Sequence, residues 1–296
     1  MSAPSFTLPD GYSGPVNTNP ADDESMIAIY GYTPWLSANS AAVACFAALL
    51  GVHLAWMIKY KRTRIFQFLL VLACAMELVG YIFRTMSSKN PFIVIRFVLN
   101  YFFIVCAPIF VSAAIYLGLA KLLPGLPPRS SPLGAKALIG VFVAIDTVTI
   151  LTQIVGAALI GSGYSAQADG RKPAIEPEDA NRILLAGLSV QSAASVLFIF
   201  ILVRVIVRGS RAASGVRTAL YLLLASDLLI VLRTLFRLAE SAEGTFSGVS
   251  ANQGLFVALE MIPVIVAVAL WAFVPLGRSM VIEADGEREW NGRDKA

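Results

Sequence analysis

Residues 66–86, FQFLLVLACAMELVGYIFRTM, form an apolar stretch that only a few polar side chains interrupt. About 20 apolar residues make a helix long enough to cross the hydrocarbon core of a bilayer. Six other stretches of the chain reach that length: 36–58, 92–120, 136–161, 183–207, 216–239 and 254–276. These stretches lack the period-two alternation of transmembrane β-strands. The sequence therefore predicts an all-α integral membrane bundle of seven transmembrane helices.

The composition supports a membrane protein and excludes an ordinary soluble one. Of the 296 residues, 57% are hydrophobic and only 14% are charged, and the mean hydropathy is +0.73. A soluble domain carries about 25% charged residues. The net charge of +4 does not indicate nucleic-acid binding, because the basic residues lie in short clusters between the apolar stretches. Such clusters are typical of charges that orient membrane helices.

The distribution of these basic residues predicts the orientation of the chain. Fourteen Lys and Arg residues follow the first, third, fifth and seventh spans, and four lie on the opposite side. Because basic residues stay cytoplasmic, the N-terminus is expected outside and the C-terminus inside. We expect an extracellular tail at 1–35 without a cleavable signal peptide, a transmembrane domain at 36–277 and a cytoplasmic tail at 278–296. Two longer connections are expected, a Pro-rich link at 122–133 and a polar external loop at 162–182.

Cysteine and histidine are too few for the common cofactor and metal sites. Cys45, Cys74 and Cys106 lie in three separate spans, and His53 is the single histidine. A disulfide framework, a CxxC metal site and ligation of haem by two histidines are therefore excluded. We expect no metal and no cofactor. An intramembrane enzyme is poorly supported, because paired carboxylates are the only catalytic groups that remain.

Several ionisable residues lie deep within the predicted spans. At roughly 3 kcal/mol for each central charge, exposing five of them to lipid would cost on the order of 15 kcal/mol. We therefore expect these side chains to face one another, water or a ligand. The five deep residues are Glu77, Asp146, Asp227, Arg233 and Glu260.

Helical spacing places polar side chains on one face of four spans. Residues at i, i+3, i+4 and i+7 share a face of a helix. The polar stripes are Glu77, Gly80, Tyr81 and Arg84; Asp146, Thr149, Gln153 and Gly156; Gly187, Gln191 and Ser195; and Arg233, Arg237 and Glu240. These stripes predict a polar cavity that opens toward, or is gated from, the outer side. One alternative is a buried ion-pair and hydrogen-bond network that only fixes helix packing. For the residues near helix ends, the alternative is contact with lipid headgroups; these are Arg84, Arg96, Arg204 and Glu240.

Motifs on all seven spans make the chain resemble the fungal RTA-like family, a group linked to aminocholesterol resistance and lipid-translocating export. The resemblance covers about 240 residues. It is carried by the motifs Tyr32-Thr-Pro34, Glu77-Leu-Val-Gly80-Tyr81-Ile-Phe-Arg84, Pro108 with Ala113-Ala114-Ile-Tyr116, Asp146 with Gln153-Ile-Val-Gly156, Gly187 with Gln191, Arg233-Thr-Leu-Phe-Arg237-Leu-Ala-Glu240 with Gly244, and Glu260. The stretch after Glu260, MIPVIVAV, departs from the family pattern.

The resemblance implies a multi-pass protein, expected in the plasma membrane, that exports or flips amphipathic lipids such as sphingoid long-chain bases or sterol-like toxic compounds. Some relatives are associated with porphyrin or haem movement. The expected partners are membrane lipids and an amphipathic small molecule. The alternative function is a seven-helix lipid or stress sensor without transport activity.

A transport mechanism can be outlined from the residue types. The sequence has no Walker A motif, so ATP is not expected to drive transport. Glu77 and Glu260 are the expected partners of an ammonium head group or a proton, and Tyr81, Asp146, Gln153 and Gln191 are further candidates for substrate binding or proton coupling. The expected ion-pair or head-group contacts are Arg84, Arg233, Arg237 and Glu240.

Overall fold

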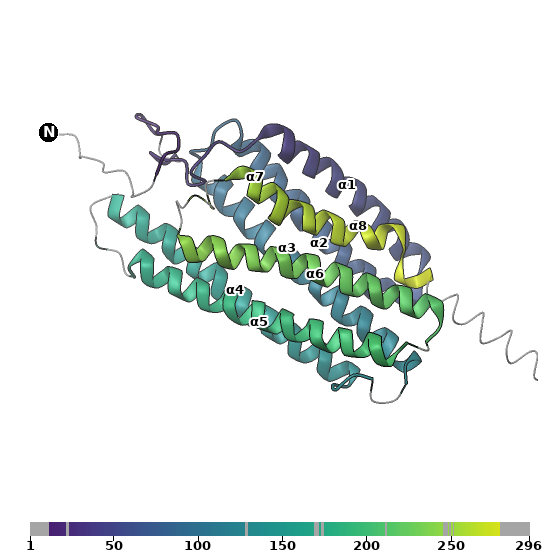
Figure 1. Ribbon diagram of the computed structural model, residues 1–296. Coiled ribbons are helices and arrows are strands. Elements are labelled where there is room, and N and C mark those ends of the chain that lie inside the picture. Colours follow the sequence, from purple (N-terminus) through teal and green to yellow (C-terminus); the bar gives the residue numbers. More distant parts are fainter. Residues whose placement is uncertain are drawn as a thin grey trace, which may run out of the picture.

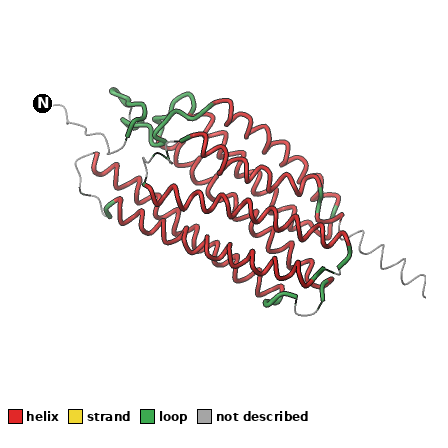
Figure 2. The backbone as a smooth tube through the Cα atoms, viewed as in Figure 1, coloured by secondary structure: helices red, strands yellow, loops and turns green. Residues whose placement is uncertain are grey.

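The computed structural model describes residues 12–21, 24–127, 130–168, 172, 175–210, 212–244, 248, 250 and 252–278. Within this part of the chain, seven helical segments are long and apolar enough to cross a membrane. Figures 1 and 2 show a bundle of these helices in which the described N-terminal residues lie at one end and the last described residues at the other. The predicted all-α fold with seven spans is confirmed.

The observed helices lie close to the predicted spans. They are α1 (Leu36–Lys59), α2 (Arg64–Ser87), α3 (Val94–Leu122), α4 (Ala135–Ala168), α5 (Pro177–Arg208), α6 (Ser214–Glu243) and a last span composed of α7 (Gln253–Phe256), the π-helical turn η3 (Val257–Met261) and α8 (Ile262–Phe273). Short 3-10 turns η1 (Lys61–Thr63) and η2 (Leu123–Gly125) lie in the connections. We call the end of the bundle that holds α7 the α7 end.

One predicted loop is wrong. The stretch 162–182 was expected to be a polar external loop, but α4 continues to Ala168 and α5 begins at Pro177. Polar residues at these positions prolong the helices beyond the apolar stretches, and Pro177 is compatible with the first turn of a helix. Of the expected tails, residues 1–11 and 279–296 lie outside the described residues.

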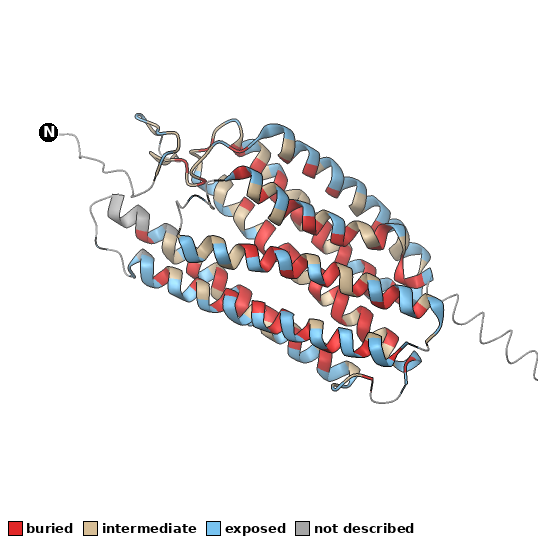
Figure 3. Ribbon diagram, viewed as in Figure 1, coloured by how far each residue is buried: buried red, intermediate tan, exposed pale blue. Residues whose placement is uncertain are grey.

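Helix α3 occupies the centre of the bundle. It packs against α2, α4, α6 and α8, whereas α1 packs against α2 and α8 at the rim. Accordingly, 67% of the most apolar stretch of α3 is buried, against 17% for α1. Figure 3 shows buried residues on the inner faces of the helices and exposed residues on their outer faces. The exposed side chains are largely apolar, as a surface in contact with lipid requires.

Segment 12–35 covers the α7 end of the bundle. Isolated β-bridges join Val16 to Ile27 and Glu24 to Ile93. The Tyr30 hydroxyl donates to Ser87 Oγ at 3.2 Å and accepts from the Asn100 amide at 3.2 Å, which ties the segment to α2 and α3. Gln253 accepts from the Trp35 N–H and donates to Thr33 O. The segment is thus fastened to three of the spans.

The carboxylate of Glu24 makes the attachment of this segment pH-dependent. The Asn90 amide donates to Glu24 Oε1 at 2.6 Å, and the Ala21 N–H and the Asn17 amide donate to Oε2. These hydrogen bonds, that of Asn90 first, hold the pKa of Glu24 below its usual value. A carboxyl group with a lowered pKa in the folded state stabilises that state above its usual pKa, and the stabilisation is lost as the pH falls through the lowered value.

We therefore predict that acidification loosens the contact between segment 12–35 and the 88–93 connection. Hydrogen exchange of the Ser25 amide, which donates to Phe92 O, should speed up as the pH falls below the usual pKa of a glutamate, after correction for intrinsic exchange. Glu24→Gln should remove this pH dependence. Identical pH dependence in both proteins would contradict the assignment to Glu24.

Candidate functional site

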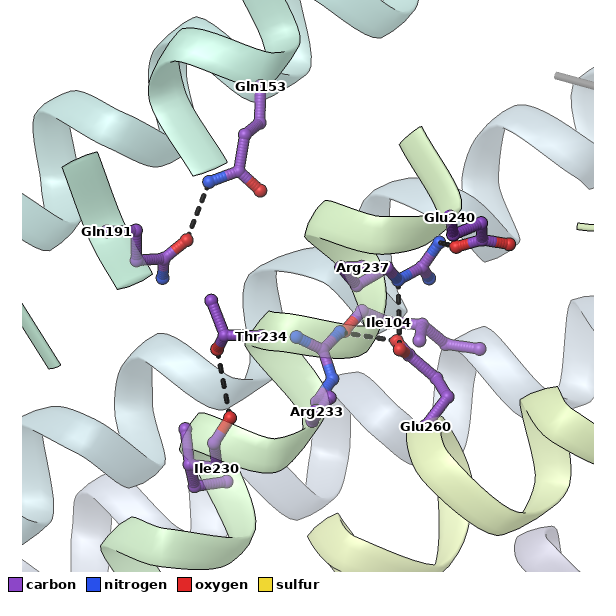
Figure 4. Close-up of polar contacts among 9 residues, drawn as sticks. All are labelled: Ile104, Gln153, Gln191, Ile230, Arg233, Thr234, Arg237, Glu240 and Glu260. Carbon is purple, nitrogen blue, oxygen red and sulfur yellow. Dashed lines mark hydrogen bonds and ion pairs between the residues drawn. The ribbon is translucent and has the colours of Figure 1, made fainter. Parts of the chain in front are cut away.

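Four charged side chains form an ion-pair cluster between α6 and the last span (Figure 4). The carboxylate of Glu260 is bridged by two arginines, with Arg233 Nη2 at 2.6 Å from Oε1 and Arg237 Nε at 2.9 Å from Oε2. Arg237 Nη1 also pairs with Glu240 Oε2 at 3.1 Å. The Glu260 side chain is completely buried, so the two guanidinium groups replace the water it would otherwise need.

Local helix geometry explains why these side chains meet. Arg233, Arg237 and Glu240 follow one another at i, i+4 and i+7 and therefore share one face of α6. Glu260 lies in the π-helical turn η3, just before Pro263. Proline lacks the N–H that would continue the α-helical ladder, and π-turns inside helices are frequent at functional sites. The predicted polar stripe on α6 and the importance of Glu260 agree with this arrangement.

Helix α3 completes the surroundings of the cluster. The backbone carbonyl of Ile104 accepts a hydrogen bond from Arg233 Nη2 at 2.9 Å. The guanidinium of Arg237 lies 5.4 Å from the centre of the Tyr101 ring, a distance that allows a cation–π contact. Sequence reasoning missed both partners, since a backbone carbonyl leaves no trace in the sequence and Tyr101 resembles any other aromatic residue of an apolar helix.

Glu77 on α2 belongs electrostatically to the same cluster. The charged groups that act on it are Arg233, Glu260 and Arg237. Its side chain is 1% exposed, and Oε1 has no hydrogen-bond partner. The close approach of α2 to α3 at Gly80, where an added Cβ would lie 2.7 Å from Ile104 Cγ1, holds this face of α2 against the centre of the bundle. A buried carboxyl oxygen next to the paired arginines is thus left unsatisfied.

The formal charges of the cluster balance once Arg84 is counted. Arg233, Arg237 and Arg84, which acts on Glu240, carry three positive charges, and Glu77, Glu240 and Glu260 carry three negative charges when all are ionised. What is incomplete is the hydrogen bonding of Glu77, because its buried Oε1 has no donor. A buried carboxylate oxygen without a donor is costly, so Glu77 is the position that can accept a hydrogen bond from a further group, whether a proton donor or a cationic group.

Arg84 lies among aromatic rings and not in the ion-pair cluster. Its guanidinium carbon is 3.8 Å from the centre of the Phe256 ring and 5.1 Å from that of Tyr30, and Nη2 donates to the Tyr32 hydroxyl at 2.7 Å. Arg84 is 3% exposed. The alternative that Arg84 and Glu240 extend to lipid headgroups is wrong for both, because aromatic rings enclose Arg84 and Arg237 holds Glu240.

The polar stripes of α4 and α5 form a separate set of contacts. Gln153 on α4 donates to Gln191 Oε1 on α5 at 2.7 Å, so these two amides satisfy each other (Figure 4). Asp146 accepts a hydrogen bond from the Tyr116 hydroxyl of α3 at 2.9 Å.

The ring of Tyr81, on α2, stacks on Phe46 of α1, with a distance of 5.6 Å between ring centres. The structure thus groups Glu77, Arg233, Arg237, Glu240 and Glu260, with Tyr81 and Arg84 close enough to act on them through charge. Asp146, Gln153 and Gln191 make their contacts elsewhere.

A pocket of about 550 Å³ opens at the α7 end. It lies between segment 12–35 and the start of the last span, and its lining residues are Tyr32, Thr33, Trp35, Gly248, Asn252, Gln253 and Gly254. The residues expected to line a polar cavity do not line this pocket. Tyr32 nevertheless connects its wall to Arg84 through the hydrogen bond described above.

We predict that Glu260→Gln lowers the stability of the folded protein. The substitution leaves two buried guanidinium groups without the carboxylate between them, and breaking a buried pair of this kind costs about 3–5 kcal/mol. The thermal unfolding midpoint of the detergent-solubilised protein should fall by on the order of 10 °C. Glu178→Gln, at an exposed position in the first turn of α5, is the matched control. Equal midpoints for the two variants would contradict a stabilising role of the Glu260 ion pairs.

Comparison with curated proteins finds relatives that are named as transporters. The Saccharomyces cerevisiae (strain Lalvin EC1118) sphingoid long-chain base transporter RSB1 is 30% identical over 172 residues, which cover 58% of this chain and 43% of that protein. The probable lipid transporter atnI of Emericella nidulans is 26% identical over 240 residues, covering 70% of this chain and 57% of the relative. Protoporphyrin uptake protein 1 of S. cerevisiae is 28% identical over 212 residues, covering 68% and 66%.

The chain spans less than half the length of the long-chain base transporter that it matches. No solved structure matches the chain. The family described as RTA1 like protein matches residues 70–282, a range that contains the ion-pair cluster, Glu77, most of α2 and every later span. This match covers most of the chain and confirms the resemblance that the sequence motifs indicated. The protein is thus a multi-pass membrane protein that belongs to the RTA1-like family.

Proposed function

We propose that this protein moves amphipathic lipids with a cationic head group, such as sphingoid long-chain bases, from one leaflet of a membrane to the other. The names of two relatives, a sphingoid long-chain base transporter and a probable lipid transporter, support this substrate class. The bundle supplies apolar helix surfaces for an alkyl chain and buried charge for a head group. The proposed activity is transport and not catalysis.

The observation that carries the proposal is the unsatisfied carboxyl oxygen of Glu77. A long-chain base has an ammonium group on an alkyl tail, and an ammonium group donates strong hydrogen bonds to a carboxylate. Glu77 Oε1 is buried and lacks a donor among the described residues. We assign the ammonium group to Glu77, while Arg233 and Arg237 keep Glu260 and Glu240 occupied.

The pocket at the α7 end is the second position that we propose for the lipid on its way across the membrane. Its volume of about 550 Å³ lies within the range of sites that hold small molecules. Tyr32 belongs to the pocket wall and holds Arg84 below it. In this path the helices around Glu77 separate to admit the head group, which then leaves through the pocket. We propose that this end lies outside, in keeping with the orientation that the basic clusters predict, and that the protein is located in the plasma membrane.

Energy for this movement has to come from a source other than ATP hydrolysis by this chain. The sequence has no Walker A motif. Downhill movement of the lipid or an ion gradient remains as the driving force.

We predict that Glu77→Gln slows transport of a long-chain base by about tenfold or more, because a lost charge-assisted hydrogen bond is worth at least about 1.5 kcal/mol. The purified protein is reconstituted in vesicles, and a long-chain base with a fluorophore at the end of its alkyl chain is followed between leaflets by albumin extraction. Glu178→Gln is the charge-matched control, and protein-free vesicles give the spontaneous rate.

Three outcomes are informative. Faster movement than in protein-free vesicles that depends on Glu77 supports the proposal. Equal rates for Glu77→Gln and the control would place the head-group site elsewhere. Saturable binding of the lipid by the purified protein without any movement would favour the alternative, a lipid sensor.

A further inference from the structure

A second buried acidic group lies outside the ion-pair cluster, where α3, α4 and α6 meet. The Tyr116 hydroxyl on α3 donates to Asp146 Oδ2 on α4 at 2.9 Å. Both Asp146 and Asp227, the latter on α6, act electrostatically on the same Tyr116 hydroxyl, and Asp146 acts on Asp227. Tyr116 thus holds Asp146 directly, whereas Asp227 acts on Tyr116 through its charge.

Within the described residues, neither Asp146 nor Asp227 forms an ion pair. Asp146 and Asp227 are each 2% exposed, and Asp227 Oδ2 has no hydrogen-bond partner. The charged group that acts on Asp227 is Asp146, another acid. An orphaned oxygen on a buried acid, independent of the Tyr116 contact, indicates that something absent from the protein chain satisfies it.

The elements packed against α6 supply no compensating cation. Helix α3 contributes Tyr116 and α4 contributes Asp146, the two titratable groups described above. On α5, Arg204 is exposed at the end opposite α7, and on the last span the ionisable residue Glu260 is held by two arginines. On α6 itself, Arg233 follows Asp227 by six residues, about 9 Å along the helix axis, and is engaged by Glu260.

The surroundings of Asp146 and Asp227 favour a proton over a larger cation. The Tyr116 ring packs against Phe198 and Phe142, with ring centres 4.6 and 5.4 Å apart, and the two phenylalanine rings are 5.2 Å from each other. These rings of α4 and α5 pack around the Tyr116 side chain that binds Asp146. Among the described residues, no group of three His, Cys, Asp or Glu side chains is suited to a metal ion. A proton needs no additional ligands and no space.

We propose that Asp227 holds one exchangeable proton, and that movement of this proton is coupled to lipid translocation. A carboxyl group that is buried and has an oxygen without a donor is destabilised when it ionises, and it therefore keeps its proton. Asp146 receives the hydrogen bond of Tyr116 and is the ionised acid, whereas Asp227 Oδ2 has no donor and Asp227 carries the proton. The coupling part rests on the proposed transport function.

The position of Asp227 provides a physical link to the lipid site. Helix α6 carries both Asp227 and the arginines that bridge Glu260. Loss of the proton places a second negative charge beside Asp146, and the repulsion between the two carboxylates acts on α6 against α4. The same helix presents Arg233 to Glu260 and Glu77. Protonation of Asp227 therefore favours the closed packing described here, and deprotonation favours its opening.

We predict that infrared difference spectra of the full-length protein in nanodiscs, recorded between acidic and alkaline pH, contain a protonated-carboxyl C=O band that belongs to Asp227. Asp227→Asn should lose this band, whereas Asp146→Asn should keep it. Asp179→Asn, an exposed residue paired with Arg182, is the matched control. Asparagine has nearly the shape of aspartic acid, and a normal elution profile on size-exclusion chromatography confirms that each variant folds.

The infrared spectra test whether Asp227 carries a proton, and this test does not depend on transport. An unchanged set of carboxyl bands in Asp227→Asn would overturn the assignment of the proton to Asp227. Coupling is tested in the reconstituted vesicles, where a pH gradient should accelerate lipid movement at least about twofold in the wild type and not in Asp227→Asn. Acceleration of equal size in both proteins would overturn the coupling. Absence of lipid movement in the wild type would refute the proposed function, and the infrared spectra would still test the proton site.

Discussion

The bundle depends on the requirement that charge inside a membrane be compensated. Glu260 is completely enclosed, and the two arginines of α6 neutralise it within 3 Å. Because the carbonyl of Ile104 on α3 also accepts from Arg233, this ion pair joins the central helix, α6 and the last span at one level. The same requirement is incompletely met at Glu77 and at Asp227, two positions within the described part of the chain where a buried carboxyl oxygen has no donor.

The two incomplete positions differ in chemistry. Glu77 is acted on by two arginines and a second glutamate, and its unsatisfied oxygen can accept a hydrogen bond from a cation or a proton donor. The charged group that acts on Asp227 is another acid, Asp146, and a proton on Asp227 removes their repulsion. Since Arg233 follows Asp227 on α6 by less than two turns, a change in charge at one position acts on the packing at the other. Because α6 carries Asp227 and also the arginines next to Glu77, displacement of this helix is a physical basis for coupling proton movement at Asp227 to lipid movement at Glu77.

Much of the fold could be predicted from the sequence, because span length and the exclusion of charge from lipid are one-dimensional constraints. The spacing of Arg233, Arg237 and Glu240 placed them correctly on one face, and the depth of Glu77 and Glu260 indicated that they lie inside. The extension of α4 and α5 through the predicted loop was missed, since helices that leave the membrane no longer need apolar residues.

The sequence could not predict which polar side chains contact one another, because these contacts depend on the relative rotation and height of helices far apart in the sequence. Asp146 was grouped with Glu77 and Glu260, but it lies beside Tyr116. The aromatic enclosure of Arg84 depends on Phe256, which precedes a π-turn that no propensity scale predicts.

The central claim, that Glu77 receives the cationic head of a lipid, is tested most directly by photo-crosslinking. A long-chain base with a diazirine next to its amine, crosslinked in membranes and mapped by mass spectrometry, should label Glu77 and its neighbours on α2. Labelling confined to lipid-facing residues of the outer helices would contradict the account.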